Sequence, residues 1–327
     1  MQIILDTRGM LMSVRNHCFL FASGERSNIV HPSRISSIVA TAPCRITTPA
    51  ILLAAENQIP LIVCNTRGQP QARLWSSNFI NTSALRRRQH LFTLSKEGLM
   101  WADAIISQKI NGQADNLDYI ATFNSHSVKT TDRGMSKGKD SPLEIAVSIT
   151  ETDGMDSIKK KILFREAYAA ARYWQRLGES LTAPFAFTNR SKRHPSDPFN
   201  ACINYLYGML RHEVETAVLS IGLDPALGVI HRDGYRMASL VFDVMEPFRP
   251  YMDRILWTAA VLGQFPADGF QLEQNAPCLI TKPGRKFLIE LFTTTLHGKI
   301  AYKQSRNSLR NHILTEIKKL SLLIKAV

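Results

Sequence analysis

Short runs of apolar residues alternate with turn residues over the first part of the chain. Each run has the length of a strand and is rich in Ile, Val, Leu or Phe, and the runs lie at residues 3–5, 18–21, 29–30, 38–39, 60–64 and 72–74. One stretch with helical spacing, residues 49–57, interrupts them, and an Asn-Thr-Arg-Gly turn at 65–68 separates the last two. The pattern predicts a small β-sandwich-like domain over residues 1–84.

The pattern changes at residue 85, after which apolar residues recur three or four positions apart, as in amphipathic helices. This spacing predicts helices over residues 91–109, 157–176, about 200–221, 283–296 and about 302–325, with another on either side of Pro250. Gly222 is placed to end the third of these in a left-handed conformation. The predicted fold class is therefore α+β: a small N-terminal β-domain followed by a larger all-helical catalytic domain over residues 85–327.

Residues 111–156 lack this periodicity. Asn, Asp, Ser, Thr, Gly and Lys dominate the segment, and its apolar runs are short, apart from a weak helical patch at residues 143–149. Such a composition predicts a long polar loop inserted in the helical domain.

The charge of the chain indicates a polyanionic partner. Its 327 residues include 40 Lys and Arg against 27 Asp and Glu, which gives a formal net charge of +13. Nucleic acid is favoured over an anionic membrane, because no basic amphipathic anchor stands out. Composition alone leaves open the alternative of a merely soluble basic protein.

The sequence also bears on the compartment of the protein. No apolar run approaches the roughly 20 residues that span a bilayer, and no charged leader precedes an apolar core at the N-terminus. The cysteines form no Cys-x-x-Cys pair and are odd in number: Cys18, Cys44, Cys64, Cys202 and Cys278. We therefore expect free thiols in a cytoplasmic protein that has no membrane partner.

Candidate chemistry concentrates between residues 197 and 250. His231 closes the apolar run Gly-Val-Ile-His, and Asp243 and Glu246 follow three positions apart, on one helix face and among apolar residues. Buried carboxylates without partners are strongly destabilising, and a metal ion is the obvious partner. Carboxylates and an imidazole without a thiolate suit Mg²⁺ or Mn²⁺. A catalytic Zn²⁺ is the alternative, although the chain has no His-Glu-x-x-His.

This region resembles the CRISPR adaptation integrase family, metal-dependent nucleases that insert new spacers into CRISPR arrays. The matching residues are Asn-Ala-x-x-Asn-Tyr at 200–205, Gly-Leu-Asp-Pro-x-x-Gly at 222–228, His231, and Ser-Leu-Val-Phe-Asp-Val-Met-Glu-Pro-Phe-Arg-Pro at 239–250. The resemblance covers most of the chain and is strongest in the C-terminal two-thirds. It implies the same two-domain fold, in which the N-terminal β-domain holds a homodimer together.

The resemblance also implies the roles of the acidic residues. Glu166, which on its own is typical of a solvated helix acid, matches the family's first metal ligand. Glu246 then completes the ligand set with Glu166 and His231, and Asp243 is either a further ligand or a residue that supports one. The catalytic and metal-binding residues expected from the resemblance are Glu166, His231, Asp243 and Glu246, with Mg²⁺ or Mn²⁺ as cofactor.

Basic clusters are the expected DNA contacts, because Lys and Arg bind phosphates. Each cluster has a plainer alternative: a solvated helix start at 86–88, a flexible linker at 183–196, and a solvated face on the last helix. The expected DNA-binding residues are Arg86, Arg87, Arg88, Arg172, Tyr173, Arg190, Lys192, Arg193, Lys303 and Arg306.

The function that the resemblance implies is the insertion of short DNA fragments as spacers into a CRISPR array, by attack of a DNA 3′-hydroxyl on a phosphodiester. The partners are double-stranded DNA, a second copy of the chain, and a small companion adaptation protein in a heterohexamer. Two alternatives stay open: a transposon-type integrase of the same family that lacks the companion, and a non-catalytic DNA-binding scaffold. The complete acidic set argues against the scaffold.

Overall fold

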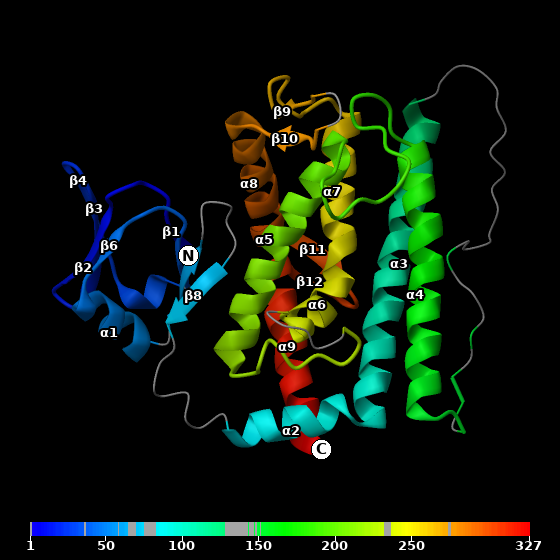
Figure 1. The fold of residues 1–327 in the computed structure, drawn as a ribbon, viewed down its shortest axis with the longest axis horizontal. Helices are drawn as coiled ribbons and strands as arrows, with labels where there is room; N and C mark the ends of the chain where they lie inside the picture. Colours follow the sequence, from blue (N-terminus) through cyan, green and yellow to red (C-terminus); the bar gives the residue numbers. More distant parts are fainter. Residues whose placement is uncertain are drawn as a thin grey trace. The chain divides into compact units, whose positions relative to one another are not determined.

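A computed structural model describes residues 2–35, 37–57, 59–64, 70–74, 83–127, 143, 147, 149–150, 152–231, 237–273 and 276–327. The chain divides into two compact units, residues 1–87 with 218–223, and residues 88–217 with 224–327. The first unit holds a β-strand region and the second is mostly helical, which confirms the predicted fold class (Figure 1).

Two four-stranded sheets build the N-terminal unit. One has the order β1 (Gln2–Leu5), β5 (Ser37–Ala40), β7 (Leu61–Cys64) and β8 (Pro70–Leu74), with the first three strands parallel and β8 antiparallel to β7. The other has the order β4 (Arg26–Val30), β3 (Cys18–Ser23), β2 (Leu11–Arg15) and β6 (Arg45–Ile46). A short 3-10 helix, η1 (Pro32–Arg34), and the helix α1 (Thr48–Glu56) connect the strands.

The two sheets share one apolar core. Leu5 of β1 and Ile38 of β5 pack in the same buried cluster as Met12 of β2 and Phe19 of β3, and Leu53 of α1 joins them. Strands form at every apolar run predicted above, and most of these runs bury at least one face in the core. The turn predicted at residues 65–68 lies outside the described residues.

The second unit is a helical bundle with two short hairpins. Its helices are α2 (Ser83–Thr93), which begins in the first unit, α3 (Lys96–Ser127), α4 (Met155–Glu179), α5 (Pro198–Ile221), α6 (Ser239–Met245), η3 (Glu246–Phe248), α7 (Arg249–Val261), α8 (Lys282–His297) and α9 (Leu309–Ala326). Its hairpins are β9 (Phe270–Gln271) with β10 (Leu279–Ile280), and β11 (Lys299–Tyr302) with β12 (Ser305–Ser308). The helices α3 and α4 run side by side (Figure 1).

The helix α3 corrects one prediction. A helix was expected to stop at Lys109 and a polar loop to begin at residue 111, but α3 continues to Ser127. The polar residues of this segment were interpreted as a loop, but two of them, Gln113 and Asn116, are buried and continue the buried stripe of the helix. The remainder of the predicted loop lies largely outside the described residues.

The last helix also begins later than the pattern indicated. It was predicted from about Tyr302, whereas residues 299–308 form the β11–β12 hairpin and α9 starts at Leu309. Lys303 has φ of 52° in the turn of this hairpin, a conformation that a helix excludes. Ser308 caps the new helix start, since its hydroxyl accepts a hydrogen bond from the N–H of Asn311.

A buried polar network ties four helices together. The carboxylate of Asp253 on α7 accepts hydrogen bonds from the hydroxyls of Tyr173 on α4 and Tyr207 on α5, at 3.0 and 2.6 Å. Asn116 on α3 donates to the Tyr173 hydroxyl at 3.0 Å and to the carbonyl of Pro250 at 2.8 Å. The prediction that Tyr173 contacts DNA is therefore wrong, because its side chain is fully buried in this network.

Within the described part of the chain, no helix is both long enough and apolar enough to cross a bilayer.

Candidate active site

A buried glutamine fixes the turn that follows α5. The helix ends at Ile221, and Gly222 adopts a φ of 87°, the left-handed conformation predicted for it. Gln89 of α2 accepts a hydrogen bond from the N–H of Asp224 at 2.8 Å, and it donates to the carbonyls of Asp224 and Leu227 at 2.8 and 3.1 Å. These bonds set the direction in which the chain runs towards the candidate histidine.

Asp243 organises the segment that carries His231. Its Oδ2 accepts hydrogen bonds from the N–H groups of Val229 and Ile230 at 2.6 and 3.2 Å, while its Oδ1 lies 2.6 Å from Nδ1 of His231. The approach requires Gly228, because a Cβ at that position would lie 2.7 Å from C and Cβ of Ser239 and 3.0 Å from Oδ2 of Asp243. A carboxylate only accepts hydrogen bonds, so Nδ1 is the donor in this contact and Nε2 is the ring nitrogen left for another partner.

Lys109 joins the two glutamates. Nζ of this lysine on α3 lies 2.6 Å from Oε1 of Glu166 on α4 and 2.6 Å from Oε2 of Glu246, the first residue of η3. Because one nitrogen atom contacts both carboxylates, they face a common point between the three helical segments. The side chain of Glu246 is 2% exposed and that of Glu166 is 20% exposed, so solvent reaches the cluster at Glu166.

Arg249 and His231 complete the surroundings of Glu246. Nη2 of Arg249 lies 3.0 Å from Oε1 of Glu246, and Nε2 of His231 lies 3.8 Å from the same oxygen. Burial alone would raise the pKa of Glu246, but Arg249 and Lys109 lower it from 4.5 to about 2. Burial alone would lower the pKa of Lys109, but Glu246 and Glu166 raise it above its ordinary value. Both Glu246 and Lys109 are therefore charged at neutral pH.

The donor atoms of this cluster suit a hard divalent cation. Two carboxylates and an imidazole nitrogen are groups that Mg²⁺ and Mn²⁺ accept as ligands, and the buried Oε2 of Glu246 has the ion contact with Lys109 but no hydrogen bond. Among the residues that the structure describes, no three His, Cys, Asp or Glu side chains already form a metal-binding group. The ammonium of Lys109 lies between the two carboxylates instead.

The basic loop predicted at residues 183–196 has two kinds of cation. Arg190 forms hydrogen bonds within the protein: its guanidinium donates to Oδ1 of Asn200 and of Asn204 at 2.9 and 2.5 Å. Lys192 has an exposed side chain, and its pKa is lowered first by the protein around it and then by the charge of Arg249. The charges of Glu246 and Lys109 also act on the pKa of Lys192, so this lysine lies near the glutamate cluster.

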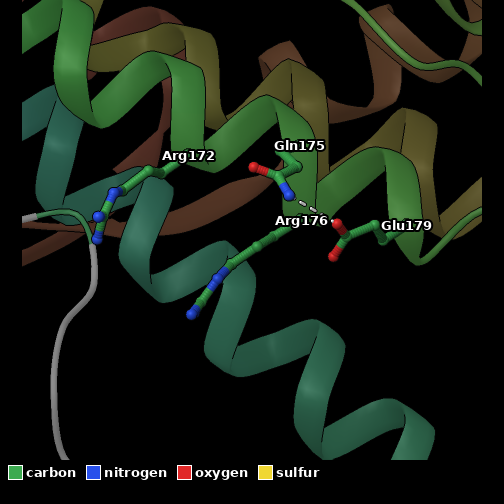
Figure 2. A pocket seen from close by; sticks show the side chains of 4 residues that line it. All are labelled: Arg172, Gln175, Arg176 and Glu179. Carbon is green, nitrogen blue, oxygen red and sulfur yellow. Dashed lines mark hydrogen bonds between the residues drawn. The ribbon is translucent and has the colours of Figure 1, made fainter.

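Two arginines of α4 extend towards the same side of the helix (Figure 2). Arg172 and Arg176 line a hollow of about 420 Å³ together with Gln175 and Glu179. The guanidinium of Arg172 also lies 4.4 Å from the ring centroid of Tyr168, one helical turn earlier. The hollow is therefore polar and carries two cations.

The other predicted DNA contacts differ in their surroundings. Arg88 donates to the carbonyl of Lys325 near the end of α9, and Lys303 pairs with Glu316 at 2.7 Å. The exposed cations outside these pairs include Arg87, Arg193 and Arg306, whereas Arg86 is partly buried. Their contact with DNA stays a prediction.

Three residues of the site escaped the sequence analysis: Lys109, Arg249 and Gln89. Lys109 carried a usable signal, because it falls on the buried stripe that Leu99, Ala102 and Ile106 begin on α3. A lysine on such a stripe needs a buried acidic partner. Nothing in the local pattern around Arg249 or Gln89 indicated their partners, since both act on residues that only the folded chain brings near.

Comparison with known proteins identifies the family. The family model described as "CRISPR associated protein Cas1" matches residues 3–294 of the chain. The chain belongs to the Cas1 family. A Cas1 relative, the "CRISPR-associated endonuclease Cas1" of Korarchaeum cryptofilum, is 28% identical over 263 residues, which are 78% of this chain and 76% of the relative.

Solved structures share the fold of this Cas1-family chain. A casposase bound to integration product matches with a TM-score of 0.75 and 20% identity, over 100% of this chain and 91% of that one. A chain of a Cas6-RT-Cas1–Cas2 complex matches with a TM-score of 0.72 and 15% identity, over 100% of this chain and 35% of that one. At these identities the likeness shows the fold alone.

Proposed function

We propose that this Cas1-family chain is a metal-dependent DNA endonuclease and integrase that inserts short DNA fragments as spacers into a CRISPR array. The observation that carries the proposal is the meeting of Glu166, Glu246 and His231, which come from three separate segments of the chain. Hard oxygen donors beside one imidazole are the ligand set of ions that assist phosphodiester chemistry. Membership of a family whose relatives are named endonucleases supports the same activity.

Each residue of the cluster has a distinct role in this proposal. Glu166, Glu246 and Nε2 of His231 would hold Mg²⁺ or Mn²⁺. Asp243 contacts His231 rather than the glutamates; it accepts a hydrogen bond from Nδ1 of the imidazole and so orients Nε2 towards the ion. Arg249 keeps the carboxylate of Glu246 in place through the contact at 3.0 Å. When bound, the cation would stabilise the negative charge that develops on the phosphodiester oxygens.

The chain needs no nucleophile of its own for this chemistry. A water molecule gives cleavage of DNA, and a DNA 3′-hydroxyl gives joining of a fragment to its target. Cations beside the cluster bind the phosphates of that DNA: Lys192 lies near the glutamates, Arg193 is exposed next to it, and Arg172 and Arg176 share one side of α4. The formal net charge of +13 supports a nucleic-acid partner.

We also propose the assembly in which the chain works. A homodimer forms through the β-rich residues 1–84, and a small companion adaptation protein joins two such dimers in a heterohexamer. The shared fold with a chain of a Cas6-RT-Cas1–Cas2 complex is consistent with a companion of the Cas2 kind. Cys18, Cys44, Cys202 and Cys278 are free thiols, which supports a reducing cytoplasm as the compartment.

The test is a joining assay with the purified chain and its companion. A short duplex with labelled 3′-hydroxyl ends is incubated with a plasmid that carries one CRISPR repeat, in Mg²⁺ or Mn²⁺. We expect label to appear in the plasmid at the borders of the repeat, and EDTA to abolish the transfer. Transfer that persists in EDTA would contradict the metal-dependent mechanism.

A plasmid without the repeat separates the remaining alternatives. Because the chain shares its fold with a casposase, a transposon-type integrase stays an alternative. Such an enzyme would join the duplex to its own target without the companion and without preference for the repeat. A non-catalytic scaffold would bind the duplex in both assays and transfer no label.

A further inference from the structure

Lys109 fills the position between the two carboxylates that a metal ion would take. Its Nζ lies 2.6 Å from an oxygen of Glu166 and 2.6 Å from an oxygen of Glu246, and the side chain is 10% exposed. Arg249, by contrast, has an ion pair with Glu246 and, among the described residues, none with Glu166. Mg²⁺ binds carboxylate oxygens at roughly 2.1 Å, so an ammonium and such an ion have no room between the same two oxygens.

The charge balance of the cluster leads to the same conclusion. Glu166 and Glu246 form ion pairs with two cations, Lys109 and Arg249, whereas the third carboxylate of the site, Asp243, contacts the imidazole of His231. A divalent ion added beside these pairs would lie against two positive charges in a largely buried site. Like charges repel strongly where little water screens them, and removing the ammonium takes away one of the two.

We infer that the ammonium of Lys109 occupies the metal position and that a divalent metal ion must displace it; this inference rests on the proposed function. In the metal-free protein its ammonium holds Glu166 and Glu246 together and offsets their repulsion. Metal binding therefore competes with this internal ion pair, and the affinity for metal is lower than the ligands alone would give. Lys109 is a positioning residue in this account, since it acts on the glutamates and not on DNA.

The variant Lys109→Met tests the inference, because methionine keeps much of the side-chain length and removes the charge. We expect Mn²⁺ to bind this variant at least about tenfold more tightly than the parent, measured by titration calorimetry without DNA. We also expect the variant to unfold at a lower temperature than the parent in EDTA. Added Mn²⁺ should raise the unfolding temperature of the variant by more than it raises that of the parent. Lys192→Met is the matched control, since it removes a lysine that lies near the same glutamate, and it should strengthen Mn²⁺ binding by less than about threefold.

A second variant covers the case in which Lys109→Met does not fold in EDTA. Lys109→Gln is also uncharged, but its amide still donates hydrogen bonds to the carboxylates, and it should show the same gain of at least about tenfold in Mn²⁺ affinity. If the parent binds Mn²⁺ and joins DNA while the Lys109 variants bind Mn²⁺ equally or more weakly, the inference is overturned and the proposed function stands. A parent that neither binds Mn²⁺ nor joins DNA overturns both.

Discussion

The carboxylate of Asp243 lies 2.6 Å from Nδ1 of His231 and leaves Nε2 of the imidazole on the side of Glu246. Asp243 therefore contacts and orients His231, the proposed ligand, rather than the glutamates. The same carboxylate also accepts hydrogen bonds from the backbone N–H groups of Val229 and Ile230, so position 243 needs a side chain that only accepts hydrogen bonds.

The variant Asp243→Asn should lose joining activity while it keeps the fold. An amide nitrogen in place of one carboxylate oxygen meets a donor from Val229 or from His231, so the histidine loses its orientation or its tautomer. We expect the joining rate to fall by about 10- to 100-fold, as for other residues that support a metal ligand. Asp118→Asn, at an exposed position of α3, is the control, and equal rates for the two variants would contradict the role of Asp243.

Gln89 should contribute to stability through the turn that leads to His231. Replacing it with Ala leaves the N–H of Asp224 and the carbonyls of Asp224 and Leu227 without their partner. The free energy of unfolding should fall by about 1–3 kcal/mol in urea denaturation. The exposed Gln175→Ala should change it by less than about 0.5 kcal/mol. Similar values for both would show that the turn does not depend on Gln89.

Asp253 should give the protein an unusual pH dependence. Burial raises its pKa from 3.8 to about 6, against the hydrogen bonds from Tyr207 and Tyr173 that lower it. The folded state thus holds a proton that the unfolded state releases near pH 4, so this contribution to stability is present below that pH and is lost as the pH rises through 6. The difference is about 3 kcal/mol.

The variant Asp253→Asn isolates this effect, because asparagine does not titrate. Urea denaturation of both proteins at pH 4 and pH 7 gives the difference in unfolding free energy between them. We expect this difference to move by about 2 kcal/mol in favour of the variant at pH 7. A difference that is the same at both pH values would show that Asp253 is ionised in the folded protein throughout.

Lys192 and Arg190 are neighbours in one loop and should behave differently. Lys192→Ala should weaken binding of a DNA duplex and reduce the slope of log affinity against log salt by about one unit, as expected for one lost phosphate contact. Arg190→Ala should instead lower the unfolding temperature, since it removes hydrogen bonds to Asn200 and Asn204. The exposed Lys286→Ala is the control for charge alone. An unchanged salt slope for Lys192→Ala would place this lysine outside the DNA interface.

Periodicity and turn chemistry were enough to predict much of the fold. The strands of the N-terminal unit, the helix α4 and the stop at Gly222 follow from short-range rules that act on neighbouring residues. The same rules failed over residues 111–127, where polar side chains are buried. Asn116 looks like a loop residue in sequence, but it is satisfied by Tyr173 and Pro250, which lie far along the chain.

The candidate site was predictable in its residue types and not in its geometry. His231, Asp243 and Glu246 stood out in the residue pattern, and the family resemblance added Glu166; the structure brings these residues together around His231 and Lys109. The lysine between the glutamates could not be foreseen, because its position depends on how α3 packs against α4. The contact of Asp243 with the segment that carries His231 likewise depends on Gly228, because this residue has no side chain to keep the carboxylate away.

The most direct test of the central claim compares two glutamates of α4. Glu166→Gln removes one proposed metal ligand, whereas Glu179→Gln makes the same change at an exposed position of the same helix, in the lining of the hollow of Figure 2. In the repeat-plasmid assay with Mn²⁺, we expect a joining rate at least about 100-fold lower for Glu166→Gln, with DNA affinity within about twofold of the parent. We expect a near-parental rate for Glu179→Gln. Joining by Glu166→Gln at the parental rate would contradict the account.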